Sequence, residues 1–221
     1  MLECHALSDR GCCRRNNEDY CRIEPELGLY VLADGMGGAR AGETAARLAV
    51  DTVVESVLSA GGRRDSQVLL SAVEEAHRRV IQAAGADPDL RGMGTTLLVV
   101  LETGQELVIA SVGDSRAYLF EPGSGLSAIT EDQTWVNEVG RPLGMDEESL
   151  RNHPMRHVLT MAIGAGASLT IHYYAVQMRP SSLLLLSTDG LHGVIEAGAI
   201  EEILGGAGCN GSLRQKCEQL I

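Results

Sequence analysis

The sequence predicts an α+β fold in which a sheet of apolar strands is covered by helices on one face and by a second sheet on the other. Three runs joined by short turns, residues 95–101, 107–112 and 116–120, are nearly continuously apolar, which is typical of strands buried on both faces. Two consecutive amphipathic helices, residues 42–59 and 66–84, are expected to lie as an antiparallel pair on one face of that sheet.

Composition and charge limit the possible functions. A chain of 221 residues that is 44% hydrophobic is long enough for one domain with a sizeable core. A formal net charge of −12 argues against nucleic acid as a partner, because phosphate backbones are bound by positively charged faces. No apolar run is long enough to cross a membrane and no leader pattern begins the chain, so we expect a cytoplasmic protein. The six cysteines form no Cys-x-x-Cys pair and are expected to be free thiols.

The remaining elements follow from periodicity and turn residues. We expect an edge strand over 2–8, a hairpin over 20–24 and 28–33, strands over 169–176 and 183–187, and helices over 197–204 and 212–221. His77 falls on the polar side of its expected helix and is given no role. Residues 131–167 have little periodicity, and a loop of this length is more often functional than connective.

The most informative stretch is residues 32–38, Leu-Ala-Asp-Gly-Met-Gly-Gly, which places Asp34 where an apolar strand leaves the core. Gly35 follows, so a backbone carbonyl lies beside the carboxylate, and Mg²⁺ and Mn²⁺ prefer such oxygen ligands. Taken alone, the pattern is better explained by an ordinary tight connection. A dinucleotide loop would need glycine in place of Arg40, and the phosphate-binding Lys-Ser/Thr pair is missing.

Three further turns carry acids at the borders of strands. They are Asn17-Glu18-Asp19, Gly113-Asp114-Ser115-Arg116 and Thr188-Asp189-Gly190. Together with the Asp34 turn, and in this order, they resemble the metal-dependent type 2C protein serine/threonine phosphatases, the PPM family, in its bacterial form. The resemblance extends to Asp9, Gly11 and Arg14 in the opening loop and to Thr130-Glu131-Asp132 and His153-Pro154, and it covers nearly the whole chain from Ser8 to about Leu204.

The resemblance implies a fold and a domain organisation. The fold would be a four-layer α/β/β/α sandwich of two antiparallel sheets flanked by helices, with residues 1–221 as a single domain. Residues 136–152 would form a variable flap beside a metal-binding cleft. The family pattern ends with a late Gly-x-Asp-Asn turn that has no counterpart here, so the domain is expected to lack its C-terminal strand and its last metal-ligand motif.

The resemblance also implies a metal site. Asp34 would bridge two Mn²⁺ or Mg²⁺ ions, and Gly35 would offer its carbonyl to one of them. Glu18 and Asp189 would serve the other ion, partly through waters. Asp114, together with Asp189, would help to hold a third ion that binds more weakly.

The chemistry of phosphate esters gives independent reasons for these roles. A phosphoserine ester resists water, so its hydrolysis needs a strong nucleophile and charge neutralisation, and two ions can activate a bridging water or hydroxide for attack. Arg14 suits the substrate phosphate because its planar fork donates two parallel hydrogen bonds; a salt bridge with Asp19 or Glu18 is the alternative role. For Asp114, the alternative is that it stabilises a hairpin with Arg116.

The predicted function is therefore that of a protein-serine/threonine phosphatase, with phosphorylated proteins, and a serine/threonine kinase that acts on the same substrates, as partners. Met36 stands where many eukaryotic members carry a histidine proposed as general acid, so water or another group must protonate the leaving oxygen. Met161 replaces an arginine often seen in the family. The alternatives are a catalytically weak or inactive relative that acts as a regulatory binding module, and a hydrolase of small phosphate esters.

Overall fold

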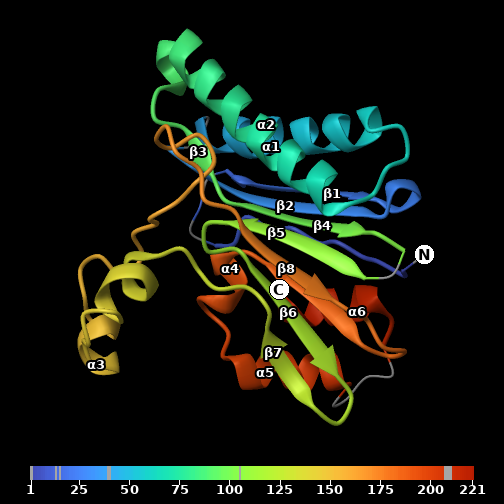
Figure 1. The fold of residues 1–221 in the computed structure, drawn as a ribbon. Helices are drawn as coiled ribbons and strands as arrows, with labels where there is room; N and C mark the ends of the chain where they lie inside the picture. Colours follow the sequence, from blue (N-terminus) through green and yellow to red (C-terminus); the bar gives the residue numbers. More distant parts are fainter. Residues whose placement is uncertain (1, 13, 15, 39–40, 105, 207–210) are drawn as a thin grey trace.

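A computed structural model shows a four-layer sandwich in which two antiparallel sheets lie between two groups of helices (Figure 1). The structure describes residues 2–12, 14, 16–38, 41–104, 106–206 and 211–221. The fold class predicted from the sequence, two antiparallel sheets with flanking helices, is confirmed.

The larger sheet has the strand order β1-β2-β4-β5-β8, with β3 paired to β2, and the smaller sheet has the order β7-β6-β9. The larger sheet is made of β1 (Asp19–Glu24), β2 (Leu29–Met36), β3 (Gly94–Thr95), β4 (Leu97–Glu102), β5 (Leu107–Val112) and β8 (His172–Val176). The smaller sheet is made of β6 (Arg116–Glu121), β7 (Gly125–Ala128) and β9 (Leu183–Ser187). The pairings within both sheets are antiparallel.

The helices form the two outer layers. The longer ones are α1 (Ala41–Ser59) and α2 (Ser66–Ala86), and the shorter ones are α3 (Glu147–Arg151), α4 (Asp189–His192), α5 (Ala197–Gly205) and α6 (Leu213–Leu220). Short 3₁₀ turns lie at Pro25–Leu27 and Pro88–Leu90, and a π-helical turn, η3, at Val136–Gly140. Helices α1 and α2 cover the larger sheet, α5 and α6 lie under the smaller one, and α3 lies apart from the sandwich (Figure 1).

Strand β4 shows why its sequence is apolar without alternation. Leu97, Val99 and Leu101 face the core under α1 and α2. Leu98 and Val100 face the second core, between the two sheets. A strand with helices on one face and a sheet on the other has no face left for polar side chains.

Two predictions of local structure are wrong. Residues 2–8 form no strand; Leu2 and Cys4 pack against the core between the sheets, so their weak alternation reflects one-sided burial. His77 is not on an exposed face, because its side chain is 7% exposed and its Nδ1 accepts a hydrogen bond from the backbone N–H of Gly164. The expected polar side of α2 is covered there by a distant loop.

The structure also describes four of the six cysteines and the character of the helices. Cys4, Cys12, Cys21 and Cys217 are free, whereas Cys13 and Cys209 lie outside the described residues. In the part of the chain that the structure describes, no helix combines the length and the apolar character needed to cross a bilayer.

The core between the sheets yields a first prediction. Leu98→Ala should lower the free energy of unfolding by about 2–5 kcal/mol, because it leaves a cavity where the side chain is 0% exposed. Leu58→Ala is the control: Leu58 is 57% exposed, and its loss should change stability by less than about 0.5 kcal/mol. Urea unfolding of both variants measures the difference, and equal effects would contradict this account of the core.

Candidate metal centre

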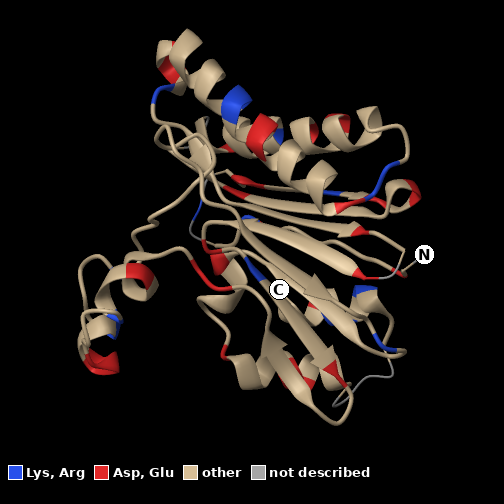
Figure 2. Cartoon of the chain, in the orientation of Figure 1, with Lys and Arg blue, Asp and Glu red and all other residues tan. Residues whose placement is uncertain are grey.

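The hairpin of β1 and β2 places two aspartates directly opposite each other. In the antiparallel ladder, Asp19 pairs with Asp34, so both side chains lie on the same face of the sheet. The hydroxyl of Thr188 donates a hydrogen bond of 2.9 Å to Asp19 Oδ2. Because Thr188 directly precedes Asp189, this bond brings the start of α4 to the same end of the sandwich, where Figure 2 shows acidic residues beside α4.

The electrostatics confirm that these carboxylates share one region. Burial, and then the charges of Asp19, Asp189 and Asp114, raise the pKa of Asp34 to about 8. Burial and the charge of Asp189 are the largest causes that raise the pKa of Asp114 to about 6. Burial also raises the pKa of Asp19. The cluster therefore holds protons that isolated aspartates would lose.

The backbone of Asp34 is fixed by Thr95, at the end of β3, and by Thr96, which lies between β3 and β4. Its N–H donates to the hydroxyl of Thr96 (2.9 Å), and its carbonyl accepts from the N–H of Thr96 (2.9 Å) and from the hydroxyl of Thr95 (2.8 Å). The Thr96 hydroxyl also lies 2.7 Å from that of Ser115, in the turn that carries Asp114. Two acid-bearing turns are thus joined through one buried threonine.

Two glycines let α1 begin against the end of β2. A Cβ on Gly35 would lie 2.2 Å from the carbonyl oxygen of Gly42, and a Cβ on Gly42 would lie 2.9 Å from the carbonyl carbon of Gly35. The carboxyl carbon of Glu18 lies 3.1 Å from the same position on Gly42. Glu18 therefore contacts the first turn of α1, and its own carbonyl accepts a hydrogen bond from the N–H of Gly35 (3.2 Å).

Arg14 and Arg116 occupy different positions relative to the cluster. Arg14 is exposed, and its charge lowers the pKa of Asp19, so it lies near the acids. Among the described residues, its expected alternative role in an ion pair with Glu18 or Asp19 is not observed. Arg116 binds Asp132 through two hydrogen bonds of 2.8 and 2.6 Å. Its charge also lowers the pKa of Asp114, but the ion pair that Arg116 forms in the described part of the chain is with Asp132.

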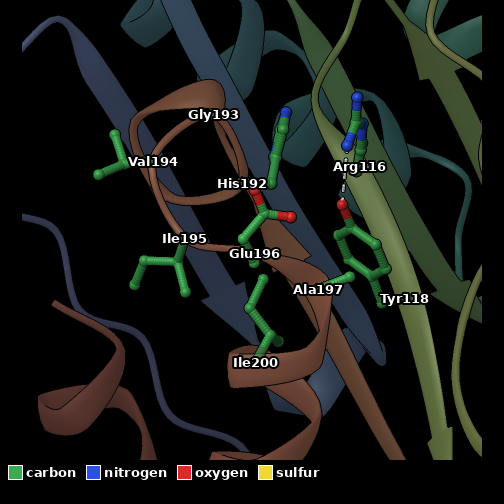
Figure 3. Close-up of a pocket in the computed structure, with 9 residues that line it drawn as sticks. All are labelled: Arg116, Tyr118, His192, Gly193, Val194, Ile195, Glu196, Ala197 and Ile200. Atoms are coloured by element: carbon green, nitrogen blue, oxygen red, sulfur yellow. Dashed lines mark hydrogen bonds between the residues drawn. The ribbon is translucent and has the colours of Figure 1, made fainter.

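A cavity of about 210 Å³ lies next to Arg116, between β6, α4 and the start of α5 (Figure 3). Tyr118, His192 and Glu196 are among its lining residues. The Nδ1 atom of His192 lies 2.9 Å from the Ser187 hydroxyl, and burial is the main cause that lowers the pKa of His192 to about 4. Its imidazole is therefore neutral at pH 7 and adds no positive charge for a phosphate.

A buried glutamine, Gln133, which no sequence motif indicated, holds the Asp114 turn. The side-chain oxygen of Gln133 accepts from the N–H of Gly113 (2.8 Å), and its amide group donates to the carbonyl of Thr170 (2.9 Å). The backbone carbonyl of Gln133 accepts from the N–H of Thr160 (2.9 Å). This side chain connects the turn to both ends of the irregular segment.

The predicted flap, residues 136–152, contains η3 and α3 and extends away from the sandwich (Figure 1). Its base is closed by Trp135, whose ring stacks on His153 with centroids 4.0 Å apart and an interplanar angle of 7°. The N–H of Trp135 also donates to the carbonyl of Val158 (2.9 Å). The chain entering the flap and the chain leaving it are thus held together near the sheets.

The donor set fits a hydrated divalent cation. Carboxylate and carbonyl oxygens are the preferred ligands of Mg²⁺ and Mn²⁺, and the raised pKa values indicate negative charge that a cation would stabilise. In the described part of the chain, no three Asp, Glu, His or Cys side chains are grouped so that they could hold an ion by themselves. Because Mg²⁺ binds through one or two carboxylates and keeps several waters, such a cage is not required.

Comparison with known proteins identifies the family. A model of the family described as Protein phosphatase 2C matches residues 14–204. The chain belongs to this family. The serine/threonine phosphatase stp of Listeria innocua is 33% identical over 204 residues, which cover 89% of this chain and 81% of that protein. A crystal structure of the Mycobacterium tuberculosis phosphatase PstP/Ppp matches with a TM-score of 0.84 and 31% identity, over 97% of this chain and 88% of that one.

A second similar structure shows the catalytic domain of PstP in complex with two manganese ions. It has a TM-score of 0.80 and 30% identity, over 97% of this chain and 87% of that one. The predicted family and the predicted enzyme class, a serine/threonine phosphatase, are confirmed by these relatives. Phosphoproteins are accordingly the substrate class of this phosphatase 2C chain.

The structure brings most of the predicted site residues together. Asp34, Asp114 and Asp189 interact electrostatically, but Glu18 is not among the main causes of the Asp34 shift. Asp19 belongs to one of the four acid-bearing turns but was given no role in the predicted site, although it lies opposite Asp34. The position of Asp19 could have been predicted from the hairpin, because the turn at residues 25–27 determines which residues of β1 and β2 face each other. The ligand roles of Glu18 and Gly35 stay predictions.

The raised pKa values predict how pH affects the metal-free protein. Between about pH 4 and pH 8 the folded state retains protons that the unfolded state has lost, so the free energy of unfolding should fall as pH rises. Asp34→Asn should flatten this decline and stabilise the metal-free protein at pH 8 by at least about 1 kcal/mol, since one pKa unit corresponds to about 1.4 kcal/mol. Urea unfolding in the presence of a chelator tests this, and parallel pH profiles would contradict it.

The close approach of Gly35 and Gly42 predicts that a side chain at either position destabilises the fold. Gly42→Ala should lower the free energy of unfolding by about 1–3 kcal/mol, because the new methyl group meets the backbone of β2. Gly85→Ala in α2 is the matched control: it meets nothing within 4 Å and should raise stability by up to about 1 kcal/mol. Thermal unfolding distinguishes the two, and similar shifts for both would show that the contact imposes no constraint.

Proposed function

We propose that this chain removes phosphate from phosphoserine and phosphothreonine in proteins at a divalent metal centre in the acidic cluster. The observation that carries the proposal is the convergence of Asp19, Asp34, Asp114 and Asp189, where burial and mutual repulsion keep protons on carboxylates. Such a site is unfavourable without a cation and well suited to one.

Two Mn²⁺ or Mg²⁺ ions would be held by Asp34, the carbonyl of Gly35, Asp189 and Glu18, and a third, weaker ion by Asp114 and Asp189. A cation bound there supplies a Lewis acid and lowers the pKa of a water for attack on phosphorus. The two manganese ions of the similar PstP structure support this assignment. Asp19 is added to the site as a neighbour that sets the charge of Asp34.

The chain's own side chains would bind and orient the phosphate. Arg14 lies near the acids and is exposed, so its guanidinium would donate two parallel hydrogen bonds to phosphate oxygens. A local cation is needed because the net charge of −12 repels a phosphorylated substrate. Met36 carries no proton to donate, so water or another group would protonate the leaving oxygen.

The cellular setting is proposed on the same basis. Residues 1–221 would act as a single phosphatase domain, opposing a serine/threonine kinase that phosphorylates the same proteins. A cytoplasmic location, expected from the sequence, stays a prediction.

The proposal predicts metal-dependent turnover. Hydrolysis of p-nitrophenyl phosphate and of a phosphothreonine peptide should rise and saturate with Mn²⁺, and Asp34→Asn should lower kcat/KM by at least about 100-fold. Glu74→Gln, on the exposed face of α2, is the control and should match the unchanged chain.

The outcomes separate the candidate functions. Turnover of the ester alone would favour a hydrolase of small phosphate esters. No turnover at any metal concentration would favour the catalytically inactive binding module.

A further inference from the structure

The imidazole of His77 is buried between α2 and the loop that follows the flap. The side chain is 7% exposed, and its Nδ1 accepts a hydrogen bond of 3.1 Å from the N–H of Gly164. Because Nδ1 accepts, the proton is on Nε2, which is buried and has no partner among the described residues. An unpaired buried donor is unfavourable, so a residue selected only for packing would be apolar here.

The loop reaches His77 because Gly164 has no side chain. A Cβ on Gly164 would lie 2.4 Å from Cγ1 of Val80, one turn along α2 from His77, and the φ angle of Gly164 is +85°. Both features require glycine at this position. The contact between α2 and the loop is therefore a specific backbone docking, in which His77 supplies the hydrogen-bond acceptor.

Continuous hydrogen bonds lead from this loop to the acidic cluster. Ile163, next to Gly164, forms a two-way bridge with Thr95, with N–H···O distances of 2.9 and 3.0 Å. The Thr95 hydroxyl donates to the carbonyl of Asp34 (2.8 Å), and Thr95 lies opposite Gly35 in the ladder. The connection runs through neutral groups, the backbone of Ile163 and Thr95 and the Thr95 hydroxyl, so it transmits position and not charge.

We propose that His77 is a positioning residue for the metal centre. Its imidazole fixes the loop at Gly164, and the loop fixes the backbone of Asp34 and Gly35 through Thr95. This inference rests on the proposed function, because its importance for activity requires that Asp34 and Gly35 hold the cation. Burial alone accounts for the lowered pKa of His77, so the neutral, accepting form prevails at pH 7.

Two substitutions at this position separate the hydrogen bond from packing. His77→Leu keeps an apolar side chain of similar size but removes the acceptor. His77→Asn places an amide oxygen near the position of Nδ1 and retains an acceptor for the Gly164 N–H. Val73→Ala is the matched control: it is buried one turn earlier on α2, at 1% exposure, and lies outside the connection to Asp34.

Amide hydrogen exchange of the metal-free protein is the primary measurement. In His77→Leu, the amides of Ile163, Thr95 and Thr96 should exchange about 2- to 30-fold faster than in the unchanged chain. His77→Asn should restore slow exchange. Val73→Ala should accelerate amide exchange in α2 but should have no specific effect on the amides of Ile163, Thr95 and Thr96.

Calorimetric Mn²⁺ binding is the second measurement, and it separates the role of His77 from the proposed function. His77→Leu should weaken Mn²⁺ binding about 2- to 30-fold, and His77→Asn should bind as the unchanged chain does. Three results would overturn the role of His77. Exchange at Thr95 and Thr96 could be unaltered in His77→Leu, it could rise only as much as in Val73→Ala, or His77→Asn could fail to restore slow exchange. Absence of Mn²⁺ binding by the unchanged chain would instead overturn the proposed function, while the exchange result still decides whether His77 fixes the backbone.

Discussion

Repulsion among buried carboxylates at one end of the sandwich is the constraint on which the rest of the structure depends. Asp19 and Asp34 lie directly opposite each other in an antiparallel ladder, where like charges are destabilising. Burial and the nearby charge of Asp189 intensify the effect. The fold sustains this arrangement because the acids stand at the ends of strands whose interiors lie in two separate apolar cores.

Such a cluster is held by close backbone packing and by a few buried side chains that bond to the backbone of the acid-bearing turns. Gly35 and Gly42 allow a helix and a strand to approach at contact distance, and Thr96 joins the Asp34 strand to the turn of Asp114. Gln133 holds that turn from the other side. These contacts are buried hydrogen bonds and backbone approaches, which have only one good geometry, so they resist the displacement that repulsion would otherwise cause.

The sequence predicted what depends on local pattern and missed what depends on distant partners. The apolar composition of residues 97–101 predicts a strand buried on both faces. The order of the four acid-bearing turns indicates the family. Gln133 and His77 could not be found in this way, because each gains its role from a segment far along the chain, at Thr170 or Gly164. Residues 2–8 differ from their predicted strand for the opposite reason: their weak alternation arises from the one-sided packing of Leu2 and Cys4 and not from a partner strand. The position of Asp19 opposite Asp34 could have been predicted, since the register of a hairpin is a local property.

A site built from mutually repelling acids ties stability to function. Asp34 and Asp114, whose pKa values are raised in the folded chain, make the metal-free fold less stable as pH rises. A cation that binds the folded chain and not the unfolded one adds stability that grows with its concentration, by about 2.7 kcal/mol at 100 times the dissociation constant. The repulsion is thus a cost only in the absence of metal. With metal bound, the same close spacing becomes the source of affinity, so a substitution that relieves the repulsion is expected to stabilise the metal-free chain and to weaken the site.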